Sequence, residues 1–363
     1  MYQKPGVLPS QRLEELMGSF IEGVPKKYIN SSSLDLPLGE EAYRLECVFL
    51  PRKGEKVRNL LDVCGATPHD LKSPLEVGVT YLVHLNGNIE LPEHVYAYAN
   101  PKSTAGRLNL SCRLVADDVP RYDTLPAGWN AGELWLLLRA DSFPILMSVG
   151  SAASQLRFFT GPAFLDPLEL QNAIRKDGLL FHPGGARYKE GEYDRHADSI
   201  YLSIGVAQGH VGWECRGTTR VLDYNKVGCY KPEPFFVPMH AVKGSVRLRK
   251  NSFYILTTSQ FIRVPRGLSA ELRATDPRVG NFTVHTAGYI DEGWGVGQSG
   301  EIPGLTITLE VTVHEDNVLL RDGQNVARIR YERMYEPSEK PYHAANSNYT
   351  NQVTARLSKH FVV

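Results

Sequence analysis

The feature that most constrains this chain is an internal duplication: one ordered set of motifs occurs in the first half and again in the second. Each set opens with a short predicted helix and a strand of alternating apolar residues. Later, a glycine–tryptophan pair precedes an apolar strand. The strands are residues 33–39 and 199–205, and the pairs are residues 128–129 and 293–294. A repeat much longer than the roughly 20–50 residues of a solenoid unit indicates a duplicated domain.

The two predicted helices carry start and stop signals in the sequence. The first runs from Ser10, as its N-cap, through apolar residues at helical spacing and ends near Gly23. The second has Asp166 as its cap, Pro167 at the first helical position and Gly178 as its stop.

Outside these helices, each half consists of short β segments that are broken by glycine, proline and asparagine. The chain of 363 residues contains 32 Gly and 23 Pro, and 42% of its residues are hydrophobic, which is ample for a packed core. Many short strands with such turn signals indicate small barrels or sandwiches. We therefore predict a mainly β protein with one domain at residues 1–164, a second at 165–336 and a C-terminal tail at 337–363.

Charge and cysteine content exclude several classes of protein. The 40 Lys and Arg residues equal the 40 Asp and Glu residues in number, so no net positive charge is available to hold a nucleic-acid backbone. No stretch approaches about 18 uncharged apolar residues, and the first residues lack the apolar core of a secretory signal. The five scattered cysteines form no CxxC pair. These features predict a soluble, cytoplasmic protein without disulfides that binds neither nucleic acid nor membrane.

A short turn at residues 100–107 concentrates cationic and hydroxyl side chains, namely Lys102, Ser103, Thr104 and Arg107. Such a turn can bind an anionic oxygen, because Arg and Lys supply charge while hydroxyls and backbone N–H groups supply directed donors. In the second half, residues 273–278 again place two arginines around a hydroxyl. Either segment alone is also consistent with a solvated basic turn, but their coincidence at matching repeat positions favours a phosphate site.

A single carboxylate interrupts the apolar strand at residues 305–313. In the alternation of the strand, Glu310 shares one face with threonines, whereas the other face is apolar. One interpretation is an outward glutamate on a solvated face. The other is a general base that is held rigidly among hydroxyls.

Other kinds of site find little support in the sequence. The eleven histidines form no HxxxH or HExxH pair, and the HxE and PCxxC motifs of zinc nucleobase deaminases are absent. The sequence contains no GxSxG elbow of an α/β-hydrolase. Residues 295–300 fit GxGxxG but lack a strand–helix context, so we interpret them as a flexible loop.

Taken together, these motifs resemble those of the deoxycytidine triphosphate deaminases, which are relatives of the deoxyuridine triphosphatases. The family motif Arg-Ser-Ser-Leu-Ala/Gly-Arg is matched well by residues 102–107 and loosely by residues 273–278. The motif Thr-Ala-x-x-Ile-Asp-Pro-Gly-Trp/Phe is matched by residues 286–294, and the strand end Leu-Glu by residues 309–310. The resemblance covers both halves and implies two tandem dUTPase-like β-barrels of the β-clip type, each with a short helix.

The resemblance also implies roles for individual residues. Glu310 matches the catalytic glutamate, Arg278 matches a residue that holds the catalytic water or the glutamate, and Asp291 matches the position that holds the deoxyribose 3′-hydroxyl. The other implied substrate-binding residues are Arg273, Ala274, Thr275, Thr286, Ala287, Thr308, Leu309, Tyr342, Asn348 and Gln352. The corresponding candidates in the first half are Lys102, Ser103, Thr104, Arg107 and Asp123.

Neither half carries the complete set of motifs. The second half has Ala274 where the family has a serine near the attacking water. The first half keeps that serine as Ser103 but has Leu137 where the catalytic glutamate is expected. Since leucine cannot act as a base, we expect the second half to be catalytic and the first to be a degenerate copy. A competing arrangement combines Ser103 and Arg107 with Glu310 in a composite site.

The function that the resemblance implies is the hydrolytic deamination of dCTP to dUTP and ammonia, which supplies dUTP for thymidylate synthesis. It implies that Glu310 acts as general acid and base without zinc, and that Mg²⁺ arrives with the triphosphate. It further implies a homotrimer and closure of the tail at 337–363 over the active site. This tail is polar and has few apolar residues before Phe361. The sequence leaves open whether thymidine triphosphate acts as a feedback inhibitor.

Two alternatives stay open at this point. The first is a dUTP diphosphatase or a bifunctional enzyme, because residues 287–291 resemble the motif whose aspartate activates water in the sister family. The glycine-rich C-terminal motif of those enzymes is absent here. The second alternative is a non-catalytic regulator that binds a deoxynucleoside triphosphate, since neither half has all the motifs.

Overall fold

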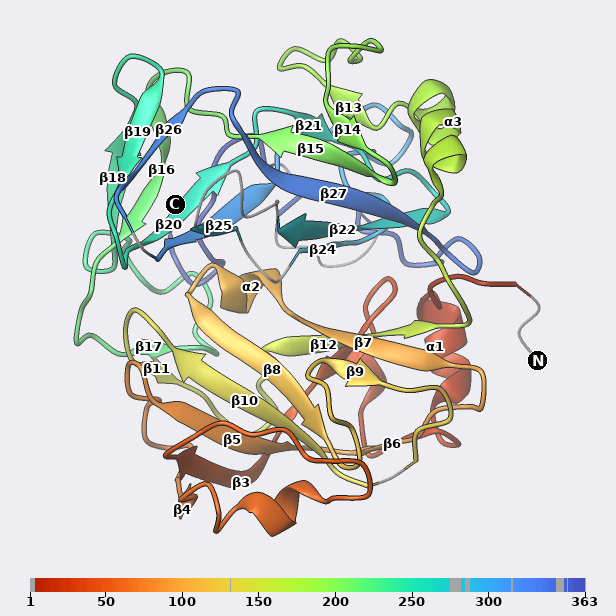
Figure 1. Ribbon diagram of the computed structural model, residues 1–363, viewed down its shortest axis with the longest axis vertical. Helices are drawn as coiled ribbons and strands as arrows, with labels where there is room; N and C mark the ends of the chain where they lie inside the picture. Colours follow the sequence, from red (N-terminus) through yellow and green to blue (C-terminus); the bar gives the residue numbers. More distant parts are fainter. Residues whose placement is uncertain are drawn as a thin grey trace. The chain divides into compact units, whose positions relative to one another are not determined.

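The computed structural model describes residues 4–130, 132–274, 282–284, 288–314, 316–343, 349–350 and 352–362. The chain is mainly β and divides into two compact units (Figure 1). The first unit consists of Met1–Pro162, Gly217–Phe235 and Ser358–Val362, and the second consists of Ala163–Arg216, Phe236–Leu357 and Val363. The sequence analysis predicts two domains and a tail as three consecutive segments, whereas each unit here combines separated segments. Part of the second repeat and the end of the predicted tail belong to the first unit.

Two antiparallel sheets form most of the first unit. One has the order β4-β3-β5-β10-β8 and the other the order β2-β12-β7-β9. The strands of the larger sheet are β4 (Thr67–Pro68), β3 (Leu38–Leu45), β5 (Thr80–Leu85), β10 (Leu134–Ala140) and β8 (Leu110–Ala116). Those of the smaller sheet are β2 (Leu34–Leu36), β12 (Ser154–Phe159), β7 (Tyr96–Pro101) and β9 (Thr124–Leu125).

The second unit also contains two main antiparallel sheets, with the orders β18-β16-β20-β25-β23 and β14-β15-β27-β22-β24. The first of these has β18 (Phe236–His240), β16 (His210–Cys215), β20 (Phe253–Thr257), β25 (Thr308–Val313) and β23 (Phe282–Val284). The second has β14 (Arg195–His196), β15 (Ser199–Ser203), β27 (Asn325–Arg333), β22 (Leu268–Ala274) and β24 (Tyr289–Ile290).

The corresponding strands of the two units have the same order and register, and β14 is an additional edge strand of the second unit. In the larger sheet of the first unit, Leu137 of β10 pairs with Leu82 of β5. In the second unit, Glu310 of β25 pairs with Ile255 of β20, at the same places in the corresponding strands. The structure therefore confirms the duplication that the sequence predicts.

Smaller elements complete the two units. Two short 3₁₀ helices lie at Lys26–Tyr28 and Val57–Leu60. The two-stranded pairs are β1 (Ile21–Glu22) with β6 (Asn88–Ile89), β11 (Ile145–Leu146) with β17 (Leu222–Asp223), β13 (Leu180–Phe181) with β21 (Phe261–Ile262), and β19 (Ser245–Leu248) with β26 (Val318–Arg321).

One helix prediction is confirmed and the other is wrong in its extent. Helix α3 spans Pro167–Asp177, with a capping box between Asp166 and Glu169 and with Gly178 at positive φ as its C-cap. Helix α1 spans only Ser10–Leu16 and has Pro9 rather than Ser10 as its N-cap. It stops early because Gly18 adopts a φ of 82°, which turns the chain into β1. A further single turn of helix, α2, covers Ser103–Gly106.

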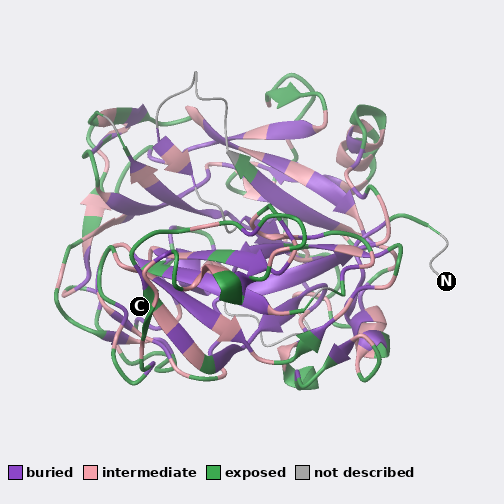
Figure 2. Cartoon of the chain, turned by 60° about the horizontal axis from the view of Figure 1, so that its bottom comes forward, coloured by how far each residue is buried: buried purple, intermediate pink, exposed green. Residues whose placement is uncertain are grey.

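Distant segments of the chain complete the core of the first unit. The ring of Phe235 lies 4.9 Å from that of Phe143 and 5.5 Å from that of Phe361, measured between centroids. The buried His360 donates from Nε2 to the carbonyl oxygen of Tyr224 at 2.8 Å. Figure 2 shows the buried strands of both units in purple. Residues 217–235 and 358–362 are thus structural parts of the first unit.

Candidate active site

Glu310 lies on β25 with both faces of the strand covered. The apolar side chains of Leu305, Ile307, Leu309, Val311 and Val313 belong to the core of the second unit, as the alternation predicts. The opposite face is also buried, since Thr306, Thr308 and Glu310 expose only 2%, 6% and 5% of their surface. The interpretation of Glu310 as an outward glutamate on a solvated face is therefore wrong.

The hydroxyl of Thr308 lies on the same face as Glu310 and is buried. Within the described parts of the chain, its Oγ1 atom has no hydrogen-bond partner. A buried polar group without a partner costs about 1–3 kcal/mol, so structures retain one mainly where a water or a ligand satisfies it. Thr308 thus offers a donor and an acceptor on the buried strand face that it shares with Glu310.

The tail residue Gln352 is hydrogen-bonded to Thr306, which lies just before β25. Its Nε2 donates to the carbonyl oxygen of Thr306 at 2.9 Å, and the Thr306 hydroxyl donates to the carbonyl oxygen of Gln352 at 3.5 Å. Tyr349, Ala355 and Leu357 of the tail are buried as well. The described part of the tail is therefore packed through several residues before Phe361, which the sequence analysis did not expect.

Arg273 and Asp291 come from the other main sheet of the second unit. Arg273 is the penultimate residue of β22, and its side chain pairs with Glu271 at 2.9 Å and lies 5.4 Å from the ring of Phe164. Asp291 directly follows β24, which pairs with β22. One sheet therefore supplies the candidate residues for ribose and phosphate, and the other supplies the candidate base Glu310.

The strand register shifts one motif correspondence between the repeats. Arg273 pairs with Arg328 in the second unit, and Asn100 pairs with Gln155 at the same place in the first. Arg273 is thus the counterpart of Asn100, two residues before Lys102. The candidates Thr275, Arg278, Thr286, Ala287 and Asn348, and the side chain of Ala274, lie outside the described residues.

The first-unit candidates lie around α2. The Lys102 ammonium forms an ion pair with Asp35, and Ser103 begins the single helical turn. The carbonyl oxygen of Thr104 accepts a hydrogen bond of 3.0 Å from the Ser358 hydroxyl. The last residues of the chain therefore pack onto the cationic turn of the first unit, of which the buried Arg107 is also part.

Asp123 is held by its own neighbours. It accepts a hydrogen bond of 2.7 Å from the backbone N–H of Leu114 and pairs with Arg113 at 2.6 Å. Burial raises its pKa to about 6, although Arg113 opposes this shift. Leu125 of β9 and Ile290 of β24 pair with equivalent positions, so the counterpart of Asp291 is Pro126 and not Asp123.

The counterpart of Glu310 in the first unit is packed in an apolar cluster. Leu137 contacts a buried group that consists of Leu45, Val57, Cys64, Leu82, Val115 and Trp135. This position of the first unit therefore holds no proton-transfer group.

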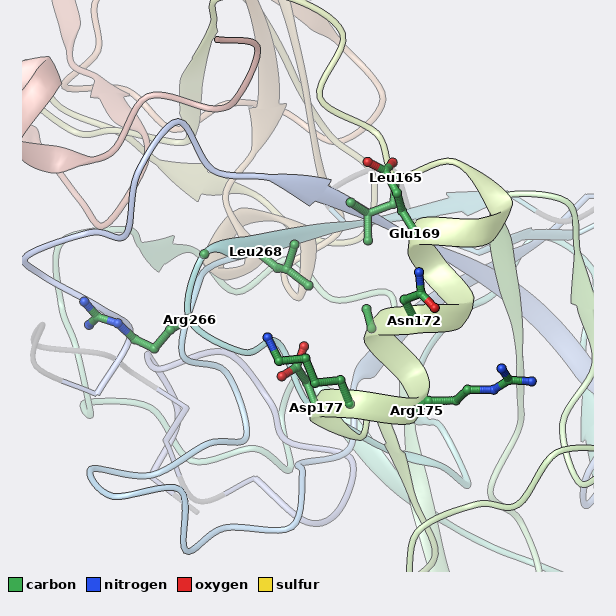
Figure 3. Close-up of a pocket in the computed structure, with 10 residues that line it drawn as sticks. Leu165, Glu169, Asn172, Arg175, Asp177, Arg266 and Leu268 are labelled. Atoms are coloured by element: carbon green, nitrogen blue, oxygen red, sulfur yellow. The ribbon is translucent and has the colours of Figure 1, made fainter.

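A groove of about 710 Å³ lies elsewhere on the second unit (Figure 3). Helix α3 forms one side and the segment of Arg266 and Leu268 the other. None of Glu310, Thr308 and Asp291 lines the groove.

In the described residues, no three His, Cys, Asp or Glu side chains gather to hold a metal ion. Nor does that part of the chain contain a helix long and apolar enough to cross a membrane.

Comparison with known families and structures agrees with the geometry. The model of the 2′-deoxycytidine 5′-triphosphate deaminase N-terminal domain matches residues 4–162, and that of the C-terminal domain matches residues 181–361. A solved structure, the 2′-deoxycytidine 5′-triphosphate deaminase from Agrobacterium tumefaciens, is 32% identical with a TM-score of 0.83. The match covers 93% of this chain and 100% of that chain. The chain belongs to the dCTP deaminase family.

Curated relatives in the dCTP deaminase family match over shorter stretches. The dUMP-forming dCTP deaminase of Methanothermobacter thermautotrophicus is 32% identical over 133 residues, which are 35% of this chain and 62% of that protein. The enzyme of the same name from Methanosphaera stadtmanae is 35% identical over 118 residues, or 31% of this chain and 55% of that protein. The chain thus spans less than two thirds of the length of these relatives.

A further buried carboxylate, Glu292, directly follows the candidate residue Asp291. Glu292 stands where the dCTP deaminase motif has proline, and it is fully buried directly after Asp291. Burial raises the pKa of its carboxyl group, against the effect of the Ser338 and Gly267 N–H groups. The departure from the motif was the signal available in the sequence.

Proposed function

We propose that the chain catalyses the deamination of dCTP to a deoxyuridine nucleotide and ammonia, with the second unit as the catalytic one. The observation that carries the proposal is the buried Glu310 on β25, which shares its buried strand face with the Thr308 hydroxyl. The shared strand order supports the further proposal that both units are dUTPase-like barrels. Leu137 then makes the first unit a degenerate copy.

Deamination requires that water attack C4 of cytosine and that ammonia leave the tetrahedral intermediate. Glu310 would take a proton from the water, deliver it to N3 and then assist the departure of the amine. A positioned carboxylate contributes about 10²–10⁴-fold as general acid and base. Thr308 would hold the water or the base by hydrogen bonding, and Arg278 would hold the water or the glutamate. Orientation of the bound base supplies the rest of the rate enhancement.

The remaining candidates would bind the sugar and the triphosphate. Asp291 would accept a hydrogen bond from the 3′-hydroxyl, while Arg273 would pair with phosphate oxygens. Tyr342 and Gln352 would close the tail over the nucleotide. We also propose that Mg²⁺ arrives with the triphosphate and shields its charge. We further propose a homotrimer and feedback inhibition by thymidine triphosphate.

The product is either dUTP or dUMP. Three curated relatives are named dUMP-forming dCTP deaminases, which favours a second candidate function in which diphosphate is also released. Asp291 is the residue that would activate the second water in that case. The Agrobacterium tumefaciens protein is named only as a deaminase.

One experiment separates these possibilities. Purified protein is incubated with dCTP and Mg²⁺, and ammonia and diphosphate are measured separately. Ammonia alone establishes formation of dUTP, and equal amounts of both products establish formation of dUMP. Tight dCTP binding without either product contradicts the proposed catalysis and favours the non-catalytic regulator.

A further inference from the structure

The fully buried carboxylate of Glu292 joins two segments that are distant in sequence. Its Oε1 accepts a hydrogen bond of 2.8 Å from the backbone N–H of Gly267. Its Oε2 accepts a hydrogen bond of 2.6 Å from the backbone N–H of Ser338, where the tail begins. Arg266 adds an ion pair at 3.4 Å. Each carboxylate oxygen thus has its own backbone donor.

The backbone of Glu292 and the residues that follow it also contact the tail at residues 338–343. The backbone N–H of Tyr342 donates to the carbonyl oxygen of Glu292 at 2.8 Å, and the rings of Tyr342 and Trp294 lie 5.0 Å apart. The backbone N–H of Gly297 donates to Nε2 of His343 at 2.8 Å. A Cβ atom on Gly293 would lie only 3.1 Å from the nitrogen of Tyr342. The loop at residues 292–297 is therefore hydrogen-bonded to residues 338–343 and packs against them.

The first unit shows that the turn forms without this glutamate. The N–H of Trp294 donates to the carbonyl oxygen of Asp291, as that of Trp129 does to Pro126. By this correspondence, Ala127 stands in the place of Glu292. Since the turn closes in the same way with alanine, the carboxylate is available to act on its partners, the tail and the segment 266–267.

We propose that Glu292 is a positioning residue, which anchors the base of the tail beside Asp291 so that Tyr342 is presented to the bound nucleotide. This inference rests on the proposed function. Hydrogen bonds from N–H groups to a carboxylate are stronger than those between neutral groups, and their loss in a buried place leaves donors unsatisfied. Removal of the carboxylate should therefore release residues 338–343 and weaken nucleotide binding, while the chemical step at Glu310 is retained.

The test compares two variants with a matched control. Glu292→Ala introduces the residue of the first unit, and Glu292→Gln keeps the volume but leaves only one acceptor oxygen. Glu332→Gln is the control, because Glu332 is also fully buried and accepts a hydrogen bond of 3.1 Å from the side chain of Ser269 instead. Amide hydrogen exchange of residues 336–343 is measured without nucleotide, and KM and kcat for dCTP are measured separately.

Both Glu292 variants should raise the exchange rate of residues 336–343 about tenfold or more. They should raise KM about tenfold and change kcat less than about twofold, whereas the control should leave all three nearly unchanged. If Glu292→Ala does not fold, Glu292→Gln still decides the matter. Unchanged exchange in the variants overturns the anchoring role, and faster exchange with unchanged KM overturns the link to nucleotide binding. A wild-type protein that binds dCTP without deaminating it overturns the proposed function, whereas faster exchange in the variants still supports the anchor.

Discussion

Two units with one strand order differ most at a single pair of equivalent positions. In the first unit, Leu137 packs among apolar side chains. In the second, Glu310 occupies the same place in the sheet and is equally buried, but it shares its strand face with the hydroxyl of Thr308. The same strand order and register therefore accommodate either a leucine or a glutamate at this position. One buried position holds an apolar side chain in the first unit and a carboxylate in the second.

The turns that follow β9 and β24 also differ in the polarity of their side chains. The first unit has Pro126 and Ala127, which only close the turn. The second has Asp291 and Glu292, of which Glu292 holds the tail. Only one copy therefore carries polar side chains at both places.

The largest effect is expected for Glu310→Gln. The change is nearly isosteric, so it should lower ammonia release from dCTP by about 10²–10⁴-fold while dCTP binding persists. Leu137→Met at the equivalent place is the control and should leave turnover unchanged. A Glu310→Gln variant with more than about a tenth of wild-type turnover would contradict the assignment of the base.

The reverse exchange should break the first unit. Leu137→Glu places a carboxylate among apolar side chains such as Val57 and Trp135, and we expect it to lower the free energy of unfolding by about 3 kcal/mol or more. Leu137→Gln, which is polar but uncharged, should cost less. Chemical denaturation at pH 7 measures both. Wild-type stability of Leu137→Glu would show that this site already admits a charge.

The arginines of the two cationic segments provide a finer comparison. If the second unit acts alone, Arg278→Ala should cost at least about 2 kcal/mol of transition-state stabilisation, or roughly 30-fold in kcat/KM. Arg107→Ala should then change kcat/KM less than about threefold in protein that remains folded. A large loss from Arg107→Ala without unfolding would instead show that both repeats contribute to one composite site.

The smallest effect concerns pH and the end of the tail. Burial lowers the pKa of His360 to about 4, so its contribution to stability is complete above about pH 6.5 and is lost as the pH falls towards 4. The stability advantage of wild type over His360→Asn should thus shrink by about 2 kcal/mol between pH 7 and pH 5. A constant difference across this range would mean that His360 is not buried as a neutral ring. The pKa of Glu292 is raised instead, so the contribution of Glu292 to the free energy of unfolding falls as the pH rises.

Local patterns made much of this architecture predictable. The capping signals around Asp166 and Gly178 act over a few residues, so α3 could be placed from the sequence, and the alternation around Glu310 gave its strand and its face. The early end of α1 could not be predicted, because apolar spacing continues past the turn at Gly18. Nor could the packing of Phe361 on Phe235, since contacts between distant segments leave no periodic signal. The partners of Glu292 escaped prediction for the same reason.

The last few residues of the chain have a consequence for biosynthesis. A ribosome makes the first 162 residues long before it makes Ser358–Val362, yet both segments belong to one compact unit. Until residues 358–362 have been made, the nascent first unit lacks the aromatic contact of Phe361 and the hydrogen bonds of Ser358 and His360. Vectorial folding can therefore begin with the first repeat, but the first unit is completed only after residues 358–362 have been made. A chain that is truncated before residue 358 would therefore lack part of the unit that is translated first.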